Sequence, residues 1–420
     1  MMRSMFSAVS GLRNHQVRMD VIGNNIANVN TVGFKGSRVT FQDMVYELTK
    51  AASAPSEGLG GSNAHQVGLG MMVRSVDTLM TQGSLESTGK STDLAIQGDG
   101  FFVLDTGQGK VFSRVGAFDV NLKKDLVDPA TGYYVMGWTK GNNAAKPTVI
   151  DTSMKPTHIN IPMGQLMLAK ATSNVTFTGN LDADEITGYK ANATVQVYDS
   201  QGTAHNLTFA FTKNATANTW DYAITTVAPT SITSGGTGTL KFNTDGSINL
   251  TAPPTGSTIP ALVVNPGNGA SAINVALDFA RAIQFASDKS DIAARYQDGF
   301  PMGVLENFFI GVDGVITGTF TNGMNQELAR VGLGVFGNPA GLLKAGANAF
   351  KQSNNSGELH YGAPATGANG TLVSGSLEMS NVDLSREFTN MIITQRGFQA
   401  NSRIISTSDE MLQELVNLKR

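Results

Sequence analysis

Cysteine is absent from this 420-residue chain, which excludes disulfide bonds, thiolate metal sites and cysteine nucleophiles. Charged residues are also few, at 15% of the chain, against roughly a quarter in an average soluble protein. The formal net charge is −3, and nothing forms a basic face for nucleic acid or a polybasic patch for a membrane surface. We therefore expect no nucleic acid among the partners.

Long apolar runs are missing as well. No window approaches the roughly 18 consecutive apolar residues of a membrane span, so we expect no membrane insertion. The first 20 residues lack the unbroken apolar core of a secretory signal, because Arg3, Arg13, His15 and Arg18 interrupt it. If the protein leaves the cytoplasm, we expect export without a cleaved signal peptide.

Sequence patterns that carry catalysis or ligand binding are not found. The glycine-rich residues 58–61 and 68–70 are not followed by the Lys-Ser/Thr of a phosphate loop, and no Gly-x-Ser-x-Gly motif occurs. The histidines stand singly, without the spacing of metal ligands, and we expect them at the surface or in turns: His15, His65, His158, His205 and His360. We predict a protein that is not an enzyme and has no catalytic residues, cofactor or metal.

Glycine, in contrast, is abundant, with 47 residues, and threonine, serine and asparagine are frequent. Asp-Gly pairs stand between short apolar runs, as at Asp99-Gly100 and Asp313-Gly314. They favour hairpin turns because both residues tolerate positive φ. Strand candidates are clearest at residues 194–198 and 206–211. The middle of the chain therefore has an all-β pattern.

Both ends of the chain are expected to be helices with a coiled-coil stripe. Apolar residues recur at alternating intervals of three and four, which is typical of a and d positions. The N-terminal stripe consists of Met5, Val9, Leu12, Met19 and Ile26, with Gln16 and Gly23 as weak members. The C-terminal stripe contains Leu384, Phe388, Met391, Phe398, Ile405 and Leu412, with polar residues at the remaining positions.

The order of these segments predicts a nested organisation. Residues near 71–143 resemble those near 295–359, which suggests one domain made from two arms with the middle inserted. We predict a mainly β fold with two nested β-rich domains and paired terminal α-helices in a coiled-coil-like domain. The expected parts are a helical domain (1–30 and 380–420), connecting segments (31–70 and 360–379), an inner β-domain (71–143 and 295–359) and an inserted outer β-domain (144–294).

Two long motifs carry a resemblance to a known family. Residues 21–35, Val-Ile-Gly-Asn-Asn-Ile-Ala-Asn-Val-Asn-Thr-Val-Gly-Phe-Lys, resemble the signature after the first helix of bacterial flagellar rod and hook proteins. Residues 380–384 and 395–405 resemble the family's C-terminal signature, and residues 98–102 resemble an internal landmark. The resemblance spans both ends and both arms, and it is weakest across residues 144–291.

The resemblance implies a structural subunit of the flagellar hook, which self-assembles into a flexible helical tube and transmits motor torque to the filament. It also implies type III export to an extracellular place, a homopolymer, and contacts with rod, hook-cap and hook–filament junction proteins. The distal rod subunit shares these termini, but the inserted middle favours the hook. A β-rich surface adhesin is a further alternative, for which only Tyr198, Trp220 and Tyr222 stand out as pocket aromatics.

The terminal stripes imply partners for physical reasons. Ordering the backbone costs roughly 1–2 kcal/mol per residue, and a lone helix with an exposed stripe recovers little of that cost. We expect the two helices to pair and the C-terminal stripe to contact neighbouring copies. Both ends are expected to be disordered or loosely helical until copies assemble. Outer-domain contacts are expected to be polar and wet so that copies can slide, although such a composition is also typical of exported β-domains.

The asparagine-rich run after the first helix is interpreted as a joint. Its expected members are Asn24, Asn25, Asn28, Gly33, Phe34 and Lys35. Asn28 tolerates the turn conformations that end a helix, and Gly33 allows a chain reversal. Spacing alone fits a loop without a contact role equally well, whereas the resemblance favours a joint with Phe34 as an anchor on neighbouring surfaces.

Overall fold

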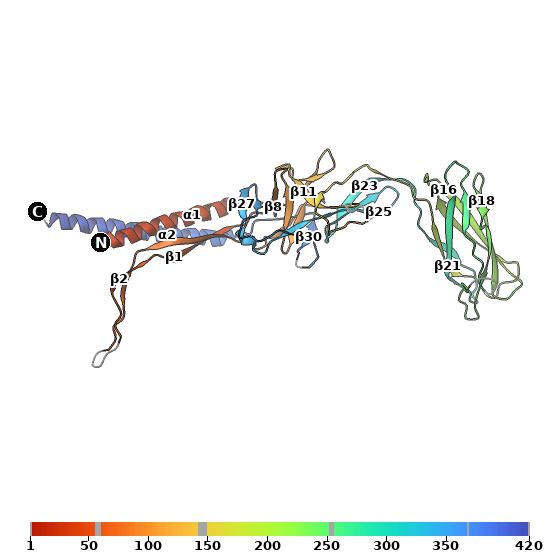
Figure 1. Ribbon diagram of the computed structural model, residues 1–420, viewed down its shortest axis with the longest axis horizontal. Coiled ribbons are helices and arrows are strands. Elements are labelled where there is room, and N and C mark those ends of the chain that lie inside the picture. The colour runs from red at the N-terminus through yellow and green to blue at the C-terminus, as the bar shows by residue number, and fades with distance from the viewer. Residues whose placement is uncertain (1, 55–59, 142–148, 252–255, 368, 419–420) are drawn as a thin grey trace. The chain divides into compact units, whose positions relative to one another are not determined.

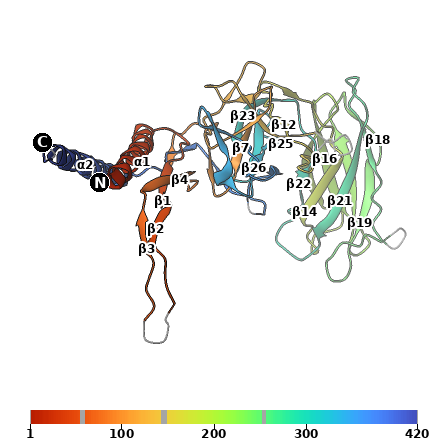
Figure 2. The ribbon, with the colours of Figure 1, turned by 60° about the vertical axis from the view of Figure 1, so that its left-hand side comes forward.

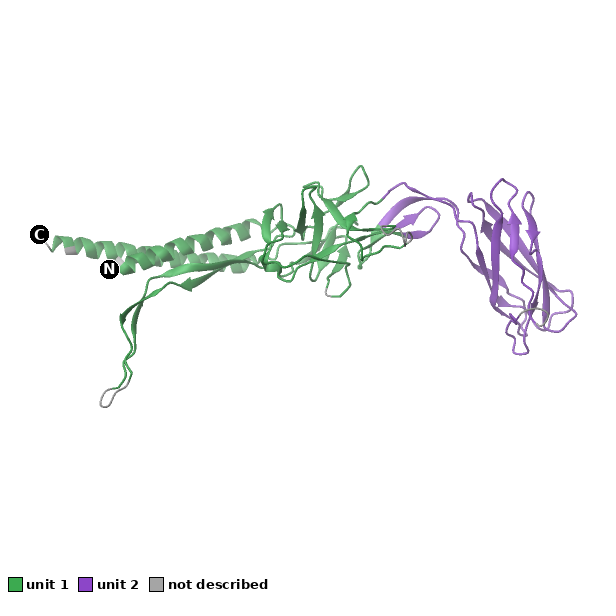
Figure 3. Cartoon of the chain, viewed as in Figure 1, with its two compact units in different colours: residues 1–161, 309–317, 327–420 green, residues 162–308, 318–326 purple. Residues whose placement is uncertain are grey.

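The computed structural model describes residues 2–54, 60–141, 149–251, 256–367 and 369–418. The chain is mainly β, with one long helix at each end (Figure 1), which confirms the predicted fold class. It divides into two compact units (Figure 3): unit 1 contains residues 1–161, 309–317 and 327–420, and unit 2 contains residues 162–308 and 318–326. No helix within the described ranges has the length and hydropathy needed to cross a membrane.

The terminal helices pair with each other in unit 1. α1 (Met2–Ala27) and α2 (Leu384–Asn417) run antiparallel and side by side (Figures 1 and 2). Neither helix contains proline, so the intrahelical hydrogen bonds are uninterrupted. Asp383 begins α2, because its carboxylate accepts hydrogen bonds from the backbone N–H groups of Ser385 and Arg386.

A long hairpin lies against α1. Its base is β1 (Ser37–Asp43), which pairs antiparallel with β4 (Met71–Thr78). Asn14 of α1 donates a side-chain hydrogen bond to the carbonyl of the first β4 residue. The hairpin continues as β2 (Tyr46–Lys50) and β3 (His65–Gly68), in which every residue is exposed (Figure 2).

Strands from both arms of the chain build the rest of unit 1. Two short antiparallel pairs join the two arms: β5 (Leu85–Ser87) with β31 (Ser376–Glu378), and β6 (Leu94–Gln97) with β30 (Thr371–Ser374). β11 joins the arms by pairing with β7, β12 and β25. The remaining elements are β7 (Phe101–Asp105), β8 (Lys110–Ser113), β9 (Asp119–Val120), β10 (Leu126–Val127), β11 (Tyr134–Thr139), β12 (Thr157–His158), β25 (Asn325–Val331), β26 (Leu333–Val335), η1 (Pro339–Gly341), β27 (Leu343–Gly346), β28 (Ala349–Lys351) and β29 (His360–Gly362).

Unit 2 is a sandwich of two sheets. One sheet has the order β18-β20-β21-β14-β22, and the other has the order β15-β16-β17-β19. Its strands are β13 (Leu166–Met167), β14 (Asn174–Asn180), β15 (Lys190–Tyr198), β16 (Ala204–Lys213), β17 (Thr219–Thr226), β18 (Ser231–Ser234), β19 (Thr237–Lys241), β20 (Leu262–Asn265), β21 (Ile273–Ile283) and β22 (Ala293–Gln297). The chain passes between the units within β23 (Gly303–Ile310), β24 (Val315–Phe320) and β25.

The core of unit 2 follows directly from strand periodicity. Buried and exposed residues alternate along β15 and β16, as expected when one face of a sheet is covered. The covered faces of both sheets meet in a core with seven buried aromatic rings: Phe177, Phe209, Phe211, Trp220, Tyr222, Phe242 and Phe279. The expected turn after residue 198 is present, since β15 and β16 pair as a hairpin.

The compact units divide the chain differently from the expected parts. The expected helical domain, connecting segments and most of the inner β-domain fall together in unit 1. Residues 295–308 belong to unit 2, and residues 31–70 contain hairpin strands as well as connecting chain. The expected boundary between residues 143 and 144 lies outside the described residues, as do residues 1, 419 and 420.

Candidate functional site

The outer face of α2 carries an apolar ridge that this chain leaves uncovered. Leu384 is 39% exposed, Phe388 49%, Ile392 53% and Phe398 42%. At 100° per residue these four side chains lie within a sector of about 120°, which is the width of a stripe that normally faces a core. We refer to Leu384, Phe388, Ile392 and Phe398 as the α2 ridge.

The face of α2 that contacts α1 is made of small and polar residues. Thr394 is fully buried there, although it carries a hydroxyl. Its Oγ1 donates to the carbonyl of Asn390, so the buried polar group is satisfied within the helix. The pairing inside one chain therefore leaves the α2 ridge uncovered.

Glycines allow the two helices to approach closely. A Cβ atom built on Gly11 of α1 would lie 2.7 Å from the side chain of Asn401. A Cβ atom built on Gly397 of α2 would lie 2.8 Å from the ring of His15. Real Cβ atoms do not occupy such positions, so any larger residue at either place would force the Asn401 or His15 side chain, or the helices, to move.

The stripe residues predicted from the sequence divide into two groups. Leu384, Phe388 and Phe398 are exposed on the α2 ridge. The others are half-buried: Met5, Val9, Leu12, Met19, Ile26, Met391, Ile405 and Leu412. Besides Asn25 and Glu387, the buried helix positions that the stripe did not include are Ala8, Gly11, Ile22, Thr394 and Ser408. A search for apolar spacing overlooks them because four of these five are glycine, alanine or hydroxyl residues.

Asn25 connects the end of α1 to the start of β1. It is buried, its Nδ2 donates to the carbonyl of Ser37 at 2.8 Å, and its Oδ1 accepts from the backbone N–H of Ser37 at 2.9 Å. The side chain thus pairs with the backbone as a neighbouring strand would. A longer bond of 3.4 Å runs from Asn25 Nδ2 to the buried Glu387 of α2. One asparagine therefore holds both helices and the hairpin at the joint, which we define as residues 24–37.

Other predicted joint residues shape the chain reversal after α1. Asn28 Nδ2 donates to the carbonyl oxygen and to the side-chain oxygen of the exposed Asn24, which satisfies acceptors at the helix C-terminus. Gly33 has φ +67°, and a Cβ there would lie 2.8 Å from Val115. Its backbone N–H donates to the carbonyl of Glu378 at 2.7 Å. Both the conformation and the space at residue 33 therefore require glycine.

Lys35 is the centre of a buried charge cluster. Its Nζ lies 2.6 Å from Glu378 Oε1, and the side chains of both residues are almost fully buried. Arg114 approaches the other carboxylate oxygen of Glu378 at 3.3 Å. Burial lowers the pKa of Lys35, and the Glu378 carboxylate partly offsets this effect. Because the cluster joins residues from three distant parts of the sequence, it fixes the joint to β31 and β8 of the inner β-region.

The β27–β28 hairpin covers the opposite side of the joint. Lys344 Nζ donates to the carbonyl of Lys35 and to Ser37 Oγ, each at 3.0 Å, and lies 5.1 Å from the centre of the Phe34 ring. Asn348 Nδ2 donates to the carbonyl of Val32 at 3.1 Å. Phe34 is buried in its own chain, so the expected anchor on neighbouring surfaces is, in the single chain, an anchor within unit 1.

Sequence reasoning missed three residues of this site, namely Glu378, Arg114 and Asn381. Asn381 Oδ1 accepts from the backbone N–H of Gly36, and its Nδ2 donates to the carbonyl of Leu79. Glu378 and Arg114 have no local pattern that marks them. The available signal was Lys35, because a lysine next to Gly33 and Phe34 in a tight joint needs a counter-ion if it is buried.

The described residues show no arrangement suited to metal binding, since no group of three or more potential ligands is found among them.

The prediction that every histidine lies at the surface or in a turn was wrong for one of them. His205 is buried in unit 2, with Nε2 3.0 Å from Asp199 and Nδ1 2.7 Å from Thr230. A polar residue on a covered strand face is buried with partners rather than exposed. Trp220 and Tyr222 are also core residues, so they cannot line the glycan pocket that an adhesin would need.

Four sequence families match successive parts of the chain. They are described as flagella basal body rod protein (residues 5–35), flagellar hook protein FlgE/F/G D1 domain (95–182), flagellar basal body protein FlaE D2 domain (167–300) and flagellar basal body rod FlgEFG protein C-terminal (373–418). The first match contains most of the joint, and the last contains all of α2. The motif resemblance found in the sequence is confirmed at both ends.

Individual relatives match the chain over its whole length. The flagellar hook protein FlgE of Treponema pallidum is 41% identical, with 100% of both chains covered. FlgE of Escherichia coli is 35% identical, with 98% of this chain and 99% of that protein covered. The flagellar basal-body rod protein FlgG of Bacillus subtilis is 31% identical, with 100% of both covered.

The fold is also similar to that of a solved structure. The crystal structure of Helicobacter pylori flagellar hook protein FlgE2 aligns with a TM-score of 0.52 at 14% identity, covering 70% of this chain and 100% of that chain.

Proposed function

Since this chain belongs to the flagellar hook protein family, we propose that it is a structural subunit of the flagellar hook, many copies of which assemble through their terminal helices into a flexible helical tube. The chain is part of a multi-subunit flagellar assembly, and the hook is its place there. The tube transmits motor torque to the filament while it bends. Catalysis has no role in this function.

The observation that carries the assembly mechanism is the α2 ridge. Full burial of a Leu, Ile or Phe side chain stabilises a folded or assembled state by roughly 1.5–3 kcal/mol. The four ridge residues are still 39–53% exposed in the single chain. A neighbouring copy that covers the ridge recovers this free energy. The predicted stripe residues of α1 and α2 are half-buried or exposed, so they remain available for self-assembly.

The joint and the units have separate mechanical roles. The Lys35–Glu378 pair and the Asn25–Ser37 hydrogen bonds fix the helices to the inner β-region, so the joint is rigid within a copy. Bending of the tube therefore occurs between copies, through polar contacts of the outer β-domain. We propose that the helical domain, the connecting segments, the inner β-domain and the outer β-domain predicted from the sequence act as separate mechanical parts of the subunit.

The location and the further partners follow from the same proposal. The protein is exported by the flagellar type III apparatus without a cleaved signal peptide and acts outside the cell. The homopolymer contacts rod proteins at its base, the hook cap during growth and hook–filament junction proteins at its tip.

A distal rod subunit is the second candidate, because the FlgG relative matches the chain from end to end. Two observations favour the hook. The FlgE proteins of Treponema pallidum and Escherichia coli are more similar to this chain than FlgG is, at 41% and 35% identity against 31%. The inserted segment is also present as an ordered sandwich with a complete core, whereas the rod interpretation expected it to be absent or disordered.

Electron microscopy of the purified protein tests the proposal. Full-length chains are expected to form curved tubes, and chains lacking residues 1–30 are expected to form none, because α2 then loses its partner helix. A full-length Ile186→Ser variant, changed at an exposed turn of unit 2, is the control and should polymerise normally. Straight, stiff cylinders would favour the rod, and equal polymerisation of the truncated chain would contradict the mechanism.

A further inference from the structure

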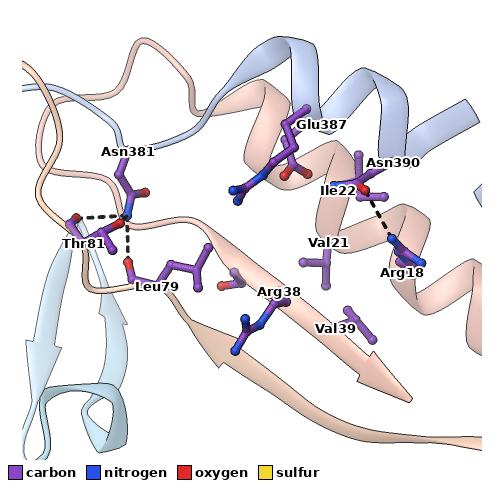
Figure 4. A pocket seen from close by; sticks show the side chains of 12 residues that line it. Arg18, Val21, Ile22, Arg38, Val39, Leu79, Thr81, Asn381, Glu387 and Asn390 are labelled. Atoms are coloured by element: carbon purple, nitrogen blue, oxygen red, sulfur yellow. Dashed lines mark hydrogen bonds between the residues drawn. The ribbon is translucent and has the colours of Figure 1, made fainter. Parts of the chain in front are cut away.

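A cavity of about 480 Å³ lies between α1, α2 and the β1–β4 hairpin in unit 1 (Figure 4). Arg18 of α1, Arg38 of β1 and Arg386 of α2 line it. Its walls also include Glu387, Asn390 and Asn381. We refer to this cavity as the arginine pocket. Arginine side chains from three separate elements line the cavity, while a single lining residue, Glu387, is acidic.

The positive charge of the arginine pocket is poorly compensated. Glu387 is buried, and its carboxylate is engaged with Asn25. Arg38 reaches Asp77 at 3.5 Å, with both side chains well exposed, a geometry that is worth little. Arg18 donates to the neutral side chain of Asn390 (Figure 4), and no ion pair of Arg386 is found among the described residues. The pocket is therefore suited to carboxylates, which guanidinium groups bind through paired hydrogen bonds.

The C-terminal end of α2 has the complementary charge. Between Ile404 and Leu418 the chain contains Asp409, Glu410 and Glu414 and neither lysine nor arginine; Arg403 precedes this stretch, and Lys419 and Arg420 follow it. Glu410 and Glu414 are exposed, and the described residues hold no ion pair for either. They are four residues apart, so their carboxylates lie on one face of the helix, one turn apart.

This end of α2 also extends beyond its partner helix. The helices are antiparallel, with Gly11 against Asn401 and His15 against Gly397. Since α1 begins at Met2, its first residues lie opposite residues near 410, and α2 continues to Asn417 (Figure 1). Met411 and Val416 are correspondingly exposed. The part of α2 after residue 410, which includes Glu414, therefore has no helix beside it in its own chain, and Glu410 lies level with the start of α1.

We propose that the arginine pocket of one copy binds the Glu410 and Glu414 carboxylates of a second copy. The proposed contact rests on the proposed function, since it joins subunits of the same polymer. It adds to that function an electrostatic contact that fixes how one copy is oriented on the next. One surface of each copy meets a different surface of the next, which is the type of contact that builds an open helical assembly. Its polar character complements the α2 ridge, which supplies apolar area without specifying register.

A charge-swap experiment tests the contact. The pocket variant carries Arg38→Glu and Arg386→Glu, and the tail variant carries Glu410→Arg and Glu414→Arg. At about 0.1 M ionic strength, where charges still interact over roughly 10 Å, each variant alone should raise the critical concentration for polymerisation at least tenfold. A chain carrying all four substitutions should return to within threefold of the wild type. Arg13→Glu combined with Arg74→Glu, two exposed arginines outside the pocket, is the matched control and should polymerise like the wild type.

The outcomes separate this contact from the proposed function. Circular dichroism first establishes that each variant retains its β structure; Arg386→Glu places a negative charge in the first turn of α2, where it is favourable. Wild-type protein that never polymerises would overturn the proposed function. A wild type that polymerises, with pocket or tail variants that do so equally well, would overturn only the charged contact. Loss of polymerisation that the chain with all four substitutions fails to restore would overturn the pairing of the arginine pocket with Glu410 and Glu414.

Discussion

At the scale of single residues, the joint places charge where a protein normally avoids it. Glu378 is fully buried between two cations, Lys35 and Arg114. A buried pair of this kind adds little net stability, because desolvation of the charges offsets their attraction. Removing one partner is costly, since the remaining charge stays buried without compensation. The cluster therefore specifies one geometry of the joint more than it adds to the free energy of folding.

We expect Glu378→Gln to destabilise unit 1 by about 3–5 kcal/mol, because Lys35 and Arg114 lose their counter-ion. Urea denaturation of the full chain, followed by Trp138 fluorescence in a Trp220→Phe background, measures the change. Asp119→Asn is the matched control: it breaks the exposed ion pair with Lys90 and should cost no more than about 1 kcal/mol. Equal effects of the two substitutions would refute the role of the buried cluster.

Unit 2 contains a second buried carboxylate, Asp199, which is stabilised by hydrogen bonds rather than by lysine and arginine. Burial raises the pKa of Asp199, but hydrogen bonds from His205, Asn268 and the backbone N–H groups of Thr203 and Gln201 outweigh burial and lower the pKa to about 2. A depressed carboxyl pKa stabilises the fold above the ordinary value of 3.8, and that contribution is lost as the pH falls toward 2.

Asp199→Asn should therefore destabilise unit 2 at pH 7 by up to roughly 2 kcal/mol, because an amide donor replaces an oxygen that accepts from His205 and Asn268. The variant should also lose less stability than the wild type between pH 4 and pH 2. Trp220 fluorescence in a Trp138→Phe background follows the unfolding of unit 2. The exposed Asp288→Asn serves as control, and a wild-type pH profile in Asp199→Asn would disprove the assignment.

At the scale of elements, the helices and the sandwich strands were predictable because apolar residues recur along them with the period of a helix or of a strand. The heptad spacing gave the helices, and alternation gave β15 and β16. The face of α2 that contacts α1 was not predictable in this way, since Gly397, Asn401 and Thr394 have no apolar signal. The hairpin with β2 and β3 was also missed, because its exposed residues show no alternation of burial.

The close approach of α1 and α2 predicts different effects for two glycines of the same helix. Gly11→Val places methyl groups against Asn401, so the Asn401 side chain must give up its hydrogen bond to the Gly397 carbonyl or the helices must separate, and polymers should dissociate at a temperature several degrees lower. Gly23→Val should leave that temperature unchanged or raise it, since a Cβ there meets nothing within 4 Å and valine is a better helix former than glycine. A decrease at Gly23 as large as that at Gly11 would argue against this helix pairing.

Substitutions in the α2 ridge are expected to weaken polymerisation far more than they weaken the folding of the single chain. Phe388→Ser combined with Phe398→Ser should raise the critical concentration for polymerisation at least tenfold, because burying each ring contributes roughly 1.5–3 kcal/mol and about 1.4 kcal/mol corresponds to a factor of ten. The denaturation midpoint of the unassembled chain should change much less, because about half of each residue is already exposed there, at 49% for Phe388 and 42% for Phe398. Sedimentation gives the first quantity and urea denaturation the second. Normal polymerisation of this variant would remove the ridge from the mechanism.

At the scale of the whole molecule, the two units differ in what they need from neighbours. Unit 2 has a core that its own sheets close, with Phe177, Phe209 and Trp220 fully buried. Unit 1 ends in two helices that cover each other through small and polar residues and leave the α2 ridge exposed. We therefore expect the outer sandwich to be stable in every state and the helical ends to become fully ordered only in the polymer.

Thiol labelling tests most directly whether copies of the chain cover the ridge, because the natural sequence contributes no cysteine to the background. A Phe388→Cys variant should react rapidly with a maleimide in the unassembled chain and at least tenfold more slowly in the polymer. An Ile186→Cys variant at the exposed turn of unit 2 should react at similar rates in both states. Protection of the thiol at position 388 already in the unassembled chain, or equal reactivity in the polymer, would contradict the account.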